Sequence, residues 1–297
     1  MYCSLCWTFC YTILVTKNVS ALPFLVKIPE FKKNQQVTKK EIIKVNYSNL
    51  VDTSETIRAT DDKFSQWLAG LIDGDGSLLL SKAGYASCEI TVGIMDEKAL
   101  RYIQNKIGGS IKLRSGVKAL RWRLHHKQGM VHLIHLIHGN IRNSARWIQL
   151  HKLCTHFGIP CLTPISLHNQ HSWFSGYFDA DGTITFSLKG EHQNPQLTIS
   201  VTSKNIIDVQ PFKDIFGGNI YFDKSQNGYY KWSVQSRQDV LRIRDYFKIC
   251  PSFTAKSNRI FLIDTYYELK DLRAYKDSTS VQSKAWFKFL ARWDRKF

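Results

Sequence analysis

The sequence lacks the cysteine pattern of a zinc domain or of a disulfide-stabilised domain. Its seven cysteines are an odd number, and only Cys3 and Cys6 form a CxxC pair, with Cys10 shortly after them. The other four are isolated in the sequence: Cys88, Cys154, Cys161 and Cys250. Free thiols in a reducing compartment therefore fit the sequence better than a disulfide framework or a structural zinc site.

The sequence also lacks an obvious membrane or targeting segment. Residues 1–16 are uncharged and aromatic, but they fall short of the roughly 20 residues that a spanning helix needs. They have no basic start and no arginine, which argues against a signal or transit peptide. We therefore expect no membrane partner, and we treat residues 1–60 as a leader that is partly disordered.

Acidic residues are scarce. The chain has 24 Asp and Glu against 41 Lys and Arg, a net charge of +17, and the basic residues are spread along its 297 residues. A hydrophobic fraction of 43% excludes a disordered chain. The length suggests two domains of ordinary size or one larger domain. A basic folded protein most often binds a polyanion, so nucleic acid is the first candidate partner, and a different partner is the alternative.

A duplicated segment organises the rest of the chain. The sequence WLAGLIDGDGS at 67–77 recurs as WFSGYFDADGT at 173–183. Two further matches follow in the same order: IGGSI at 107–111 with FGGNI at 216–220, and Arg121-Trp122 with Lys231-Trp232. Ordered matches at similar spacing indicate a repeated unit of about a hundred residues. We expect half-domains at 61–160 and 161–297.

Each unit has the pattern helix, strand pair, helix, strand pair, helix. The first helix ends at Asp75, with Asp61, Asp62 or Ser65 as its expected cap. The remaining elements of unit one are expected at 77–82, 87–95, 96–107, 110–115, 119–125 and, as helices, within 128–156. Those of unit two follow Asp181 at 183–189, 196–203, 205–216, 219–224, 229–235, 237–248 and 256–270, with a final helix at 280–293. The pattern αββαββα, used twice, predicts an α+β fold of two pseudo-twofold-related half-domains with antiparallel sheets.

The predicted strands alternate between apolar and polar side chains, so each sheet should have one buried and one polar face. A solvated face is the simpler interpretation of any one strand. The polar set as a whole has few acids and many hydrogen-bond donors, which favours contacts with phosphates and base edges. The candidate DNA-binding residues are Lys82, Lys112, Arg114, Arg121, Arg123, His125, Thr185, Ser187, Lys189, Lys224, Tyr229, Lys231, Ser233 and Gln235.

Small residues recur inside the repeated apolar helix, at Ala69 and Gly70 and again at Ser175 and Gly176. Glycine inside a helix costs about 1 kcal/mol relative to alanine, which is tolerable where two helices must approach closely. We therefore expect these two helices to pack against each other about a pseudo-twofold axis.

The packed helices would bring Asp75 and Asp181 together at their C-terminal ends. A helix C-terminus is already negative and disfavours an acid, so two adjacent acids there favour a bound divalent cation. An EF-hand is excluded, because counting from Asp73 places Leu78 and Gly84 where its loop needs Gly and Glu.

The nine-residue segments 68–76 (LAGLIDGDG) and 174–182 (FSGYFDADG) resemble the two signature motifs of the LAGLIDADG homing endonucleases, and the resemblance covers about residues 61–270. It implies that the motif helices form the interface and that the two sheets form a saddle over the DNA major groove. It further implies that Asp75 and Asp181 bind Mg²⁺ and act at the scissile phosphates, with the Gly74 and Ala180 carbonyls as further ligands. For Asp73 and Asp179 we expect a local hydrogen-bonding role.

The resemblance also implies a lysine near each site. Lys256 is the match in unit two, and we include it among the catalytic residues. Aligning Arg146 with Arg259 places Asn143 at the equivalent position, so no basic residue is identified in unit one. Because Ser203 matches a polar strand residue of the family where unit one has Ile94, we expect two unequal sites.

The implied activity is a metal-dependent double-strand cut with 3′ overhangs in a long DNA target, made by a monomer. An intron RNA maturase that binds its own intron RNA, with or without DNA cleavage, is the alternative. An aspartic protease is excluded by the strong positive charge and by the placement of the Asp-Gly pairs after helices. The resemblance implies an organellar intron-encoded protein with an exon-derived leader, expected in mitochondria, with the chloroplast as alternative.

Two weaker patterns remain. His132, His135 and His138 recur every third residue, so they drift around a helix and indicate a solvated or phosphate-facing edge rather than a metal site. The C-terminal aromatic residues are expected to cover the core: Trp286, Phe287, Phe289 and Trp293.

Overall fold

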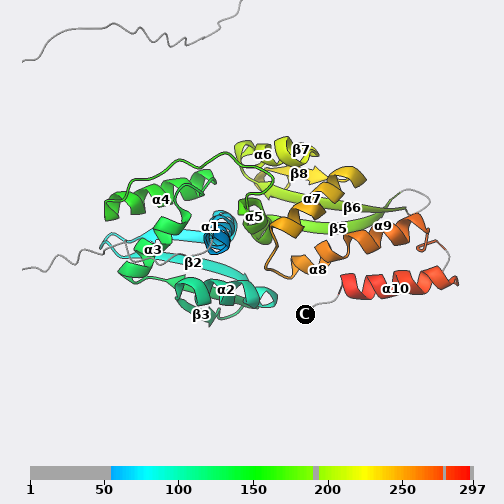
Figure 1. Ribbon diagram of the computed structural model, residues 1–297, viewed down its shortest axis with the longest axis horizontal. Helices are drawn as coiled ribbons and strands as arrows, with labels where there is room; N and C mark the ends of the chain where they lie inside the picture. Colours follow the sequence, from blue (N-terminus) through cyan, green and yellow to red (C-terminus); the bar gives the residue numbers. More distant parts are fainter. Residues whose placement is uncertain (1–54, 190–193, 277–278, 295–297) are drawn as a thin grey trace, which may run out of the picture. The chain divides into compact units, whose positions relative to one another are not determined.

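The computed structural model describes residues 55–189, 194–276 and 279–294 (Figure 1). The CxxC pair and most of the predicted leader lie outside the described residues. No helix within the described ranges combines the length and the apolar character that crossing a bilayer requires.

Unit one contains a four-stranded antiparallel sheet and four long helices. Its sheet has the order β1-β2-β4-β3. Along the chain the elements are α1 (Glu55–Asp75), β1 (Gly76–Leu80), β2 (Ala86–Gly93), α2 (Glu97–Ile107), β3 (Ser110–Leu113), β4 (Ala119–Leu124), α3 (Lys127–Ile137) and α4 (Ser144–Phe157).

Unit two repeats this plan and extends it at the C-terminal end. Its sheet has the matching order β5-β6-β8-β7. Its elements are α5 (Trp173–Asp181), β5 (Gly182–Lys189), β6 (Asn194–Ser203), α6 (Ile206–Phe216), β7 (Asn219–Asp223), β8 (Tyr229–Val234), α7 (Arg237–Ile249), α8 (Lys256–Phe261), α9 (Ile263–Asp271) and α10 (Val281–Trp293). The predicted fold class, two α+β halves with antiparallel sheets, is confirmed.

Helix boundaries differ from the prediction at α1 and at α8, whereas the helices predicted within 128–156 are present as α3 and α4. Helix α1 runs through Asp61, Asp62 and Ser65, so the predicted caps are wrong, because the preceding residues contain no glycine or proline that would stop a helix. The segment 128–156 is divided near Gly139, whose φ is 77°. The predicted helix 256–270 is two helices, α8 and α9, which meet at Leu262.

The repeated Gly-Gly and Trp have a structural cause. Trp122 Nε1 donates to Gly108 O at 2.9 Å, and Trp232 Nε1 donates to Gly217 O at 2.8 Å. The second glycine of each pair has positive φ, and a Cβ on Gly109 would lie 2.5 Å from Trp122 Nε1. The repeat at these positions therefore preserves the turn from the second helix of each unit into its third strand.

Each sheet buries one face under its helices. Cys88, Ile90 and Trp122 are fully buried in unit one, as are Ile199 and Trp232 in unit two. Helix α10 covers the edge of this core through ring contacts from the buried side chains Trp286, Phe289 and Trp293 to Phe186. Phe287 is 55% exposed, so its predicted place in the core is wrong: it lies on the outer side of the helix.

Candidate metal centre and nucleic-acid interface

Helices α1 and α5, blue and green in Figure 1, cross at two glycines. A Cβ on Gly70 would lie 2.0 Å from Trp173 O, and a Cβ on Gly176 would lie 1.9 Å from Trp67 O. No side chain fits at these distances, so the backbones touch where both helices have glycine. Ala69 is fully buried. Ser175 points elsewhere, because its Oγ donates to Pro251 O at 2.7 Å.

The two helices also exchange hydrogen bonds to buried aspartates. Trp67 Nε1 donates to Asp179 Oδ2 at 2.9 Å, and Trp173 Nε1 donates to Asp73 Oδ2 at 2.8 Å. Burial raises the pKa of Asp73 to about 7 and also raises the pKa of Asp179, while these hydrogen bonds oppose the shifts. The expected hydrogen-bonding role of the two acids is therefore not local: each acid ties its own helix to the opposite one.

Asp75 and Asp181 stand at the adjoining ends of α1 and α5, where each residue keeps part of its surface open to solvent and loses the rest to its neighbours. A Cβ on Gly74 would lie 2.2 Å from Ala180 Cβ and 3.2 Å from Asp181 Oδ2, so the second carboxylate reaches the end of the first helix. Desolvation and then the charge of Asp181 raise the pKa of Asp75 to about 6. Desolvation likewise raises the pKa of Asp181. Both acids are held where their negative charge is disfavoured without a counter-ion.

The donor set at these helix ends fits a hard divalent cation. Carboxylate and carbonyl oxygens are its preferred ligands, and Mg²⁺ commonly binds one or two carboxylates together with water and substrate phosphates. Among the described residues no group of three or more Asp, Glu, His or Cys side chains converges. A cation here would thus need oxygens from water or a phosphate to complete its coordination.

Lys256 occupies the C-terminal end of α5. Its Nζ donates to the carbonyls of Phe178 at 2.9 Å, Asp179 at 2.7 Å and Ala180 at 2.8 Å. These are carbonyls that a helix end leaves without a backbone partner. Burial lowers the pKa of Lys256, although the charges of Asp179 and Asp75 oppose the shift. The Ala180 carbonyl, a predicted metal ligand, therefore already accepts a hydrogen bond from Lys256.

Arg146 holds the equivalent place at the end of α1. Its Nε donates to Ile72 O at 3.3 Å, and Ile72 matches Phe178 in the repeat. Asn143 instead caps α4, where its Oδ1 accepts from Ala145 N at 3.0 Å. Alignment of the two units did not identify the basic partner of unit one, because Asn143 caps α4 whereas the aligned residue, Lys256, is the first residue of α8. Position in the sequence therefore did not predict position in space.

The helices that carry the two basic residues, α8 with Lys256 and α4 with Arg146, each form a hydrogen bond with the opposite unit at their first turn. Ala255 N, at the start of α8, donates to Asp96 Oδ1 at 2.7 Å. Asn205 Nδ2 donates to Ser144 Oγ, at the start of α4, at 2.9 Å. Asp96 and Asn205 occupy equivalent places between the second strand and second helix of their units. Neither was predicted, because the contact exists only once the two units are packed together.

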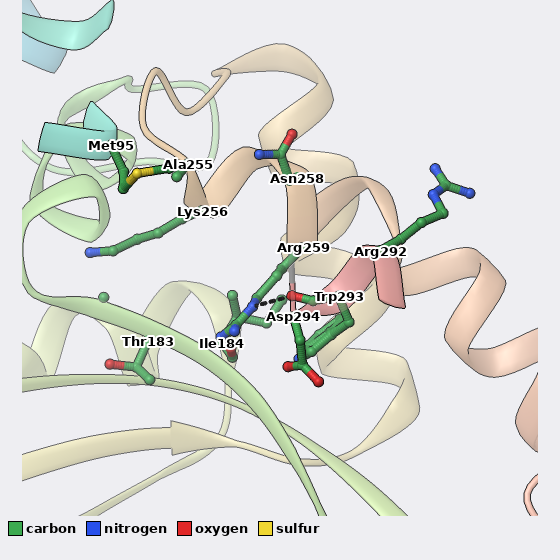
Figure 2. Close-up of a pocket in the computed structure, with 11 residues that line it drawn as sticks. Met95, Thr183, Ile184, Ala255, Lys256, Asn258, Arg259, Arg292, Trp293 and Asp294 are labelled. Carbon is green, nitrogen blue, oxygen red and sulfur yellow. Dashed lines mark hydrogen bonds between the residues drawn. The ribbon is translucent and has the colours of Figure 1, made fainter. Parts of the chain in front are cut away.

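Two pockets flank the acidic pair. One of about 550 Å³ is lined by Lys256 and Thr183 of unit two and by Met95 of unit one, and Figure 2 shows Lys256 extending from α8 along it. In the same view Arg259 donates to Trp293 O at 3.2 Å, which joins α8 to α10. The Arg259 side chain thus links α8 to α10.

The second pocket, of about 480 Å³, is lined by Arg146 of unit one, by Asp181 and by Ser203 and Lys204 of unit two. Each pocket therefore combines the basic residue of one unit with residues at or just after the end of the second strand of the other unit. This segment is apolar beside Lys256, where Met95 lies in the short 3-10 helix Ile94–Asp96 that follows β2. It is polar beside Arg146, where Ser203 Oγ donates to Asp208 Oδ2 at 2.9 Å. The two compartments are chemically unequal.

The strand faces carry most of the predicted DNA-binding side chains at the surface. Exposed or half-exposed are Lys82, Lys112, Arg114, Arg121, Arg123, His125, Thr185, Ser187, Lys224, Tyr229, Lys231 and Gln235. Ser233 is only 7% exposed, so its prediction as a contact residue is wrong: it lies on the central strand β8, where its neighbours cover it. The side chain of Lys189 lies outside the described residues.

One acid interrupts the basic face of unit one. Glu89 lies opposite Arg123 in the register of β2 and β4. Its carboxylate pairs with Arg123 Nε at 3.1 Å and with Arg121 Nη1 at 3.3 Å. Its side chain is 21% exposed, so one carboxylate holds two arginines in place on the polar face.

Known proteins resemble this chain in sequence. The family model described as LAGLIDADG endonuclease matches residues 174–267. An intron-encoded DNA endonuclease, ai2b of Dictyostelium discoideum, is 33% identical over 77% of this chain and 89% of its own length. A probable intron-encoded endonuclease, aI2 of Debaryomyces hansenii, is 50% identical over 84% of this chain, and the intron-encoded RNA maturase bI4 of Saccharomyces cerevisiae is 44% identical over 97%. The chain spans 40% and 51% of the lengths of these last two relatives.

Solved structures share the fold. The I-LtrWI LAGLIDADG homing endonuclease bound to target DNA aligns with a TM-score of 0.58 over 80% of this chain and 98% of that chain, at 13% identity. I-SmaMI bound to an uncleaved DNA target in the presence of calcium ions aligns with a TM-score of 0.55 over 77% and 97%, at 15% identity. At these sequence identities the similarity establishes the fold and the arrangement of its two halves. The chemistry must be argued from the residues of this chain.

Proposed function

Because the chain belongs to the LAGLIDADG endonuclease family, we propose that it is a site-specific endonuclease that cuts both strands of a long DNA duplex. The observation that carries the proposal is the meeting of Asp75 and Asp181 at the ends of two helices locked by glycines. The basic strand faces on either side provide hydrogen-bond donors for phosphates and base edges.

Asp75 and Asp181 would hold a divalent cation, with Mg²⁺ as the proposed ion. The cation would supply charge stabilisation at the scissile phosphate and a lowered pKa for an attacking water. Residues of the chain would position the carboxylates and balance the charge around them. Trp67 and Trp173 fix the helix ends through the buried aspartates, and Lys256 neutralises the carbonyl end of α5 beside the carboxylates.

In this proposal each of the two pockets would take one phosphate of one strand. Lys256 faces one pocket and Arg146 the other, so each strand would meet one cationic side chain and the shared acids. Arginine offers a fixed fork and stays charged, whereas lysine is a point charge whose pKa burial lowers here. The strands would therefore be cut at different rates.

A cleavage assay tests this proposed function. Duplex libraries that contain joined exon sequences from intron-lacking alleles would be incubated with the protein and Mg²⁺. We expect a single preferred site, cleavage of both strands and no product in EDTA. Products should carry 3′ overhangs. Cleavage that is independent of a divalent ion, or degradation at many sites, would contradict the proposal.

Substitution of the two basic residues tests their assignment to separate strands. We expect Lys256→Met and Arg146→Met each to slow one strand by about 10²-fold and to accumulate nicked duplex, with the nick on opposite strands. Strand-specific labels on the DNA ends give the readout. Lys63→Met is the matched control, since Lys63 Nζ also donates to a helix-end carbonyl, Ile249 O at 3.1 Å, away from the site. Nicks on the same strand in both variants would refute the assignment.

Glu89 provides a prediction on base preference. Removing its charge in Glu89→Gln frees Arg121 and Arg123 from their ion pairs, so we expect preference to change by about tenfold at the base pairs under β2 and β4 and to stay unchanged elsewhere. Sequencing of cut products from a randomised target reports this. Glu97→Gln, which removes a comparable pair with Arg101 on helix α2 at 2.9 Å, should leave the profile as in the wild type. A uniform loss of base preference across all target positions would argue against direct contacts between these arginines and the bases.

A single chain contains both acids and both sheets, so we propose a monomer. Its relatives include intron-encoded proteins of fungi, which supports a mitochondrial intron-encoded origin. Size-exclusion chromatography with light scattering should therefore report the mass of one chain, alone and on target DNA.

A second candidate function is assistance of RNA splicing. The observation that favours it is the similarity, nearly along the whole chain, to a relative named an RNA maturase. Structured RNA and duplex DNA need different surfaces, so the two functions do not exclude each other.

A further inference from the structure

One side of unit one has positive charge without any acid. From Lys98 to Phe178 the sequence contains no aspartate or glutamate, although it carries nine of the ten histidines of the chain. The first part of this stretch forms the strands of the proposed DNA-binding face. The second part forms α3 and α4, and the exposed lysine and histidine side chains on them that lie away from the β1–β2 turn define the α3–α4 face: Lys127, His132, His135, His151 and Lys152.

The α3 part of the α3–α4 face lies on the opposite side of the sheet from the polar strand face. Met130, Leu133 and Ile134 of α3 are fully buried, and the helix packs against α1 and β2 on the apolar side of the sheet. The arginines of β4 project from the opposite side. Helix α4 lies along the sheet edge, where Gln149 Oε1 accepts from Leu78 N at 3.0 Å. A duplex bound on the strands would therefore leave the outer side of α3 free.

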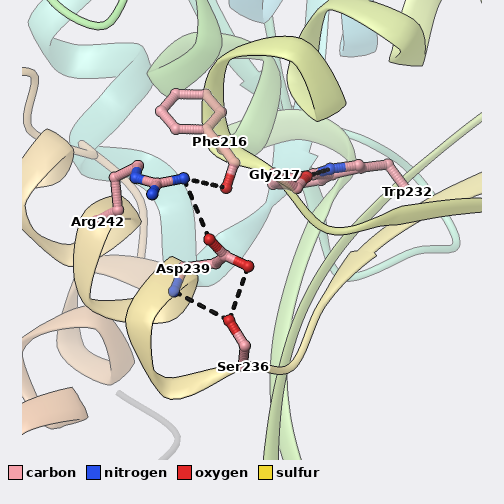
Figure 3. A network of polar contacts seen from close by, with 6 residues as sticks. All are labelled: Phe216, Gly217, Trp232, Ser236, Asp239 and Arg242. Carbon is pink, nitrogen blue, oxygen red and sulfur yellow. Dashed lines mark hydrogen bonds and ion pairs between the residues drawn. The ribbon is translucent and has the colours of Figure 1, made fainter.

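Unit two shows that this charge is not a requirement of the fold. Helix α7 holds the place of α3, and its basic side chains are paired with acids: Arg237 with Asp271 at 2.9 Å, Arg242 with Asp239 at 3.1 Å and Lys248 with Asp245 at 3.1 Å. Figure 3 shows Asp239 between Arg242 and Ser236. His135 stands where α7 has Asp245. Among the described residues, no acid pairs with a side chain of the α3–α4 face.

The side chains of this face favour a nucleic acid with unpaired bases over a duplex. Two lysines supply little charge for a duplex, whose binding depends mainly on phosphate neutralisation. Exposed imidazoles both stack on bases and donate hydrogen bonds, but only unpaired bases offer their faces, as in the loops of folded RNA. Ile148, 57% exposed on α4, adds an apolar contact.

We propose that the α3–α4 face binds the unpaired loops of a structured RNA while the strand faces remain available to DNA. The proposal rests on the second candidate function above, RNA assistance, and assigns it a surface. The lysines of the face contact phosphates, and the histidines stack on bases. DNA cleavage does not depend on this surface.

Two sets of variants test the proposal, with a hairpin RNA that has a long unpaired loop as the probe. Lys127→Glu with Lys152→Glu reverses the charge, and His132→Ala with His135→Ala removes stacking; all four side chains are exposed, so folding should be retained. Lys284→Glu with Lys288→Glu on α10 is the control with an equal charge change. Filter binding would be measured with and without target DNA, and cleavage in parallel.

We expect each α3–α4 variant to weaken hairpin binding about tenfold, with the control within twofold of wild type and DNA cleavage unchanged in all three. Hairpin binding should persist when target DNA is bound, and a fully paired RNA should bind more weakly than the hairpin. Equal loss in the control, equal binding of paired RNA, or displacement of the hairpin by target DNA would each overturn the proposal. Because cleavage is measured separately, this outcome is distinct from failure of the endonuclease function.

Discussion

Asp75→Asn and Asp181→Asn are each expected to lower the rate of double-strand cleavage by about 10²- to 10³-fold. Asparagine preserves the shape of the side chain but not its charge, and the charge is what would hold the cation. Both strands should be affected by either substitution, because the two carboxylates share one place at the ends of α1 and α5. Single-turnover cleavage at saturating protein measures the effect without a contribution from binding.

DNA affinity and folding distinguish loss of chemistry from loss of structure. Desolvation raises the pKa of both acids, so their charge is unfavourable in the metal-free protein, and neither Asn variant should unfold at a lower temperature than wild type. Asp62→Asn is the control, since Asp62 is an exposed acid in the first half of α1, more than three turns before Asp75. Wild-type cleavage by either active-site variant would remove the carboxylates from the mechanism.

Gly70→Ala is expected to destabilise the protein by about 3 kcal/mol, or about 10 °C in Tm. In an open helix the same change would stabilise by about 1 kcal/mol, so the sign of the effect is informative. The added Cβ would lie 2.0 Å from Trp173 O, and backbone cannot move aside as a side chain does. The helices must separate, which also stretches the Trp–Asp hydrogen bonds. Thermal unfolding reports the loss.

Gly176→Ala should match Gly70→Ala, because its Cβ would lie 1.9 Å from Trp67 O. Gly93→Ala is the control: Gly93 has φ −62°, and its Cβ would have only Asp96 Oδ2, at 3.9 Å, within 4 Å. That variant should unfold within a few degrees of wild type. If the two helix variants were as stable as Gly93→Ala, the close crossing would not exist in solution.

The repeat made much of the architecture predictable from sequence. Recurrence of Trp67 at Trp173 and of Asp75 at Asp181 indicated two equivalent units, and strand alternation indicated one polar face for each sheet. These features are local or periodic, so they can be recognised in one sequence. The exception on the strands, Ser233, alternates correctly but is covered by neighbours on a central strand, which periodicity does not reveal.

The site beyond the two motifs was less predictable, because its contacts join distant segments. Arg146 reaches Ile72 across 74 residues, and Asp96 reaches Ala255 across 159. Residues so far apart in the sequence do not form a motif of fixed spacing. In addition, the sequence offset between equivalent residues of the two units changes where α4 and α8 begin. Asp73 and Asp179 were recognised as hydrogen-bonding residues, but their partners, the tryptophans of the opposite helix, follow only from the crossing at Gly70 and Gly176.

The most direct test is a crystal structure of the protein on its target duplex with Mn²⁺, whose anomalous scattering locates the ion. We predict a manganese peak between the ends of α1 and α5, within about 2.5 Å of a carboxylate oxygen of Asp75 and of Asp181, with a DNA phosphate oxygen completing its coordination. Manganese bound elsewhere, or helix ends that stand apart with each acid facing solvent alone, would contradict the account.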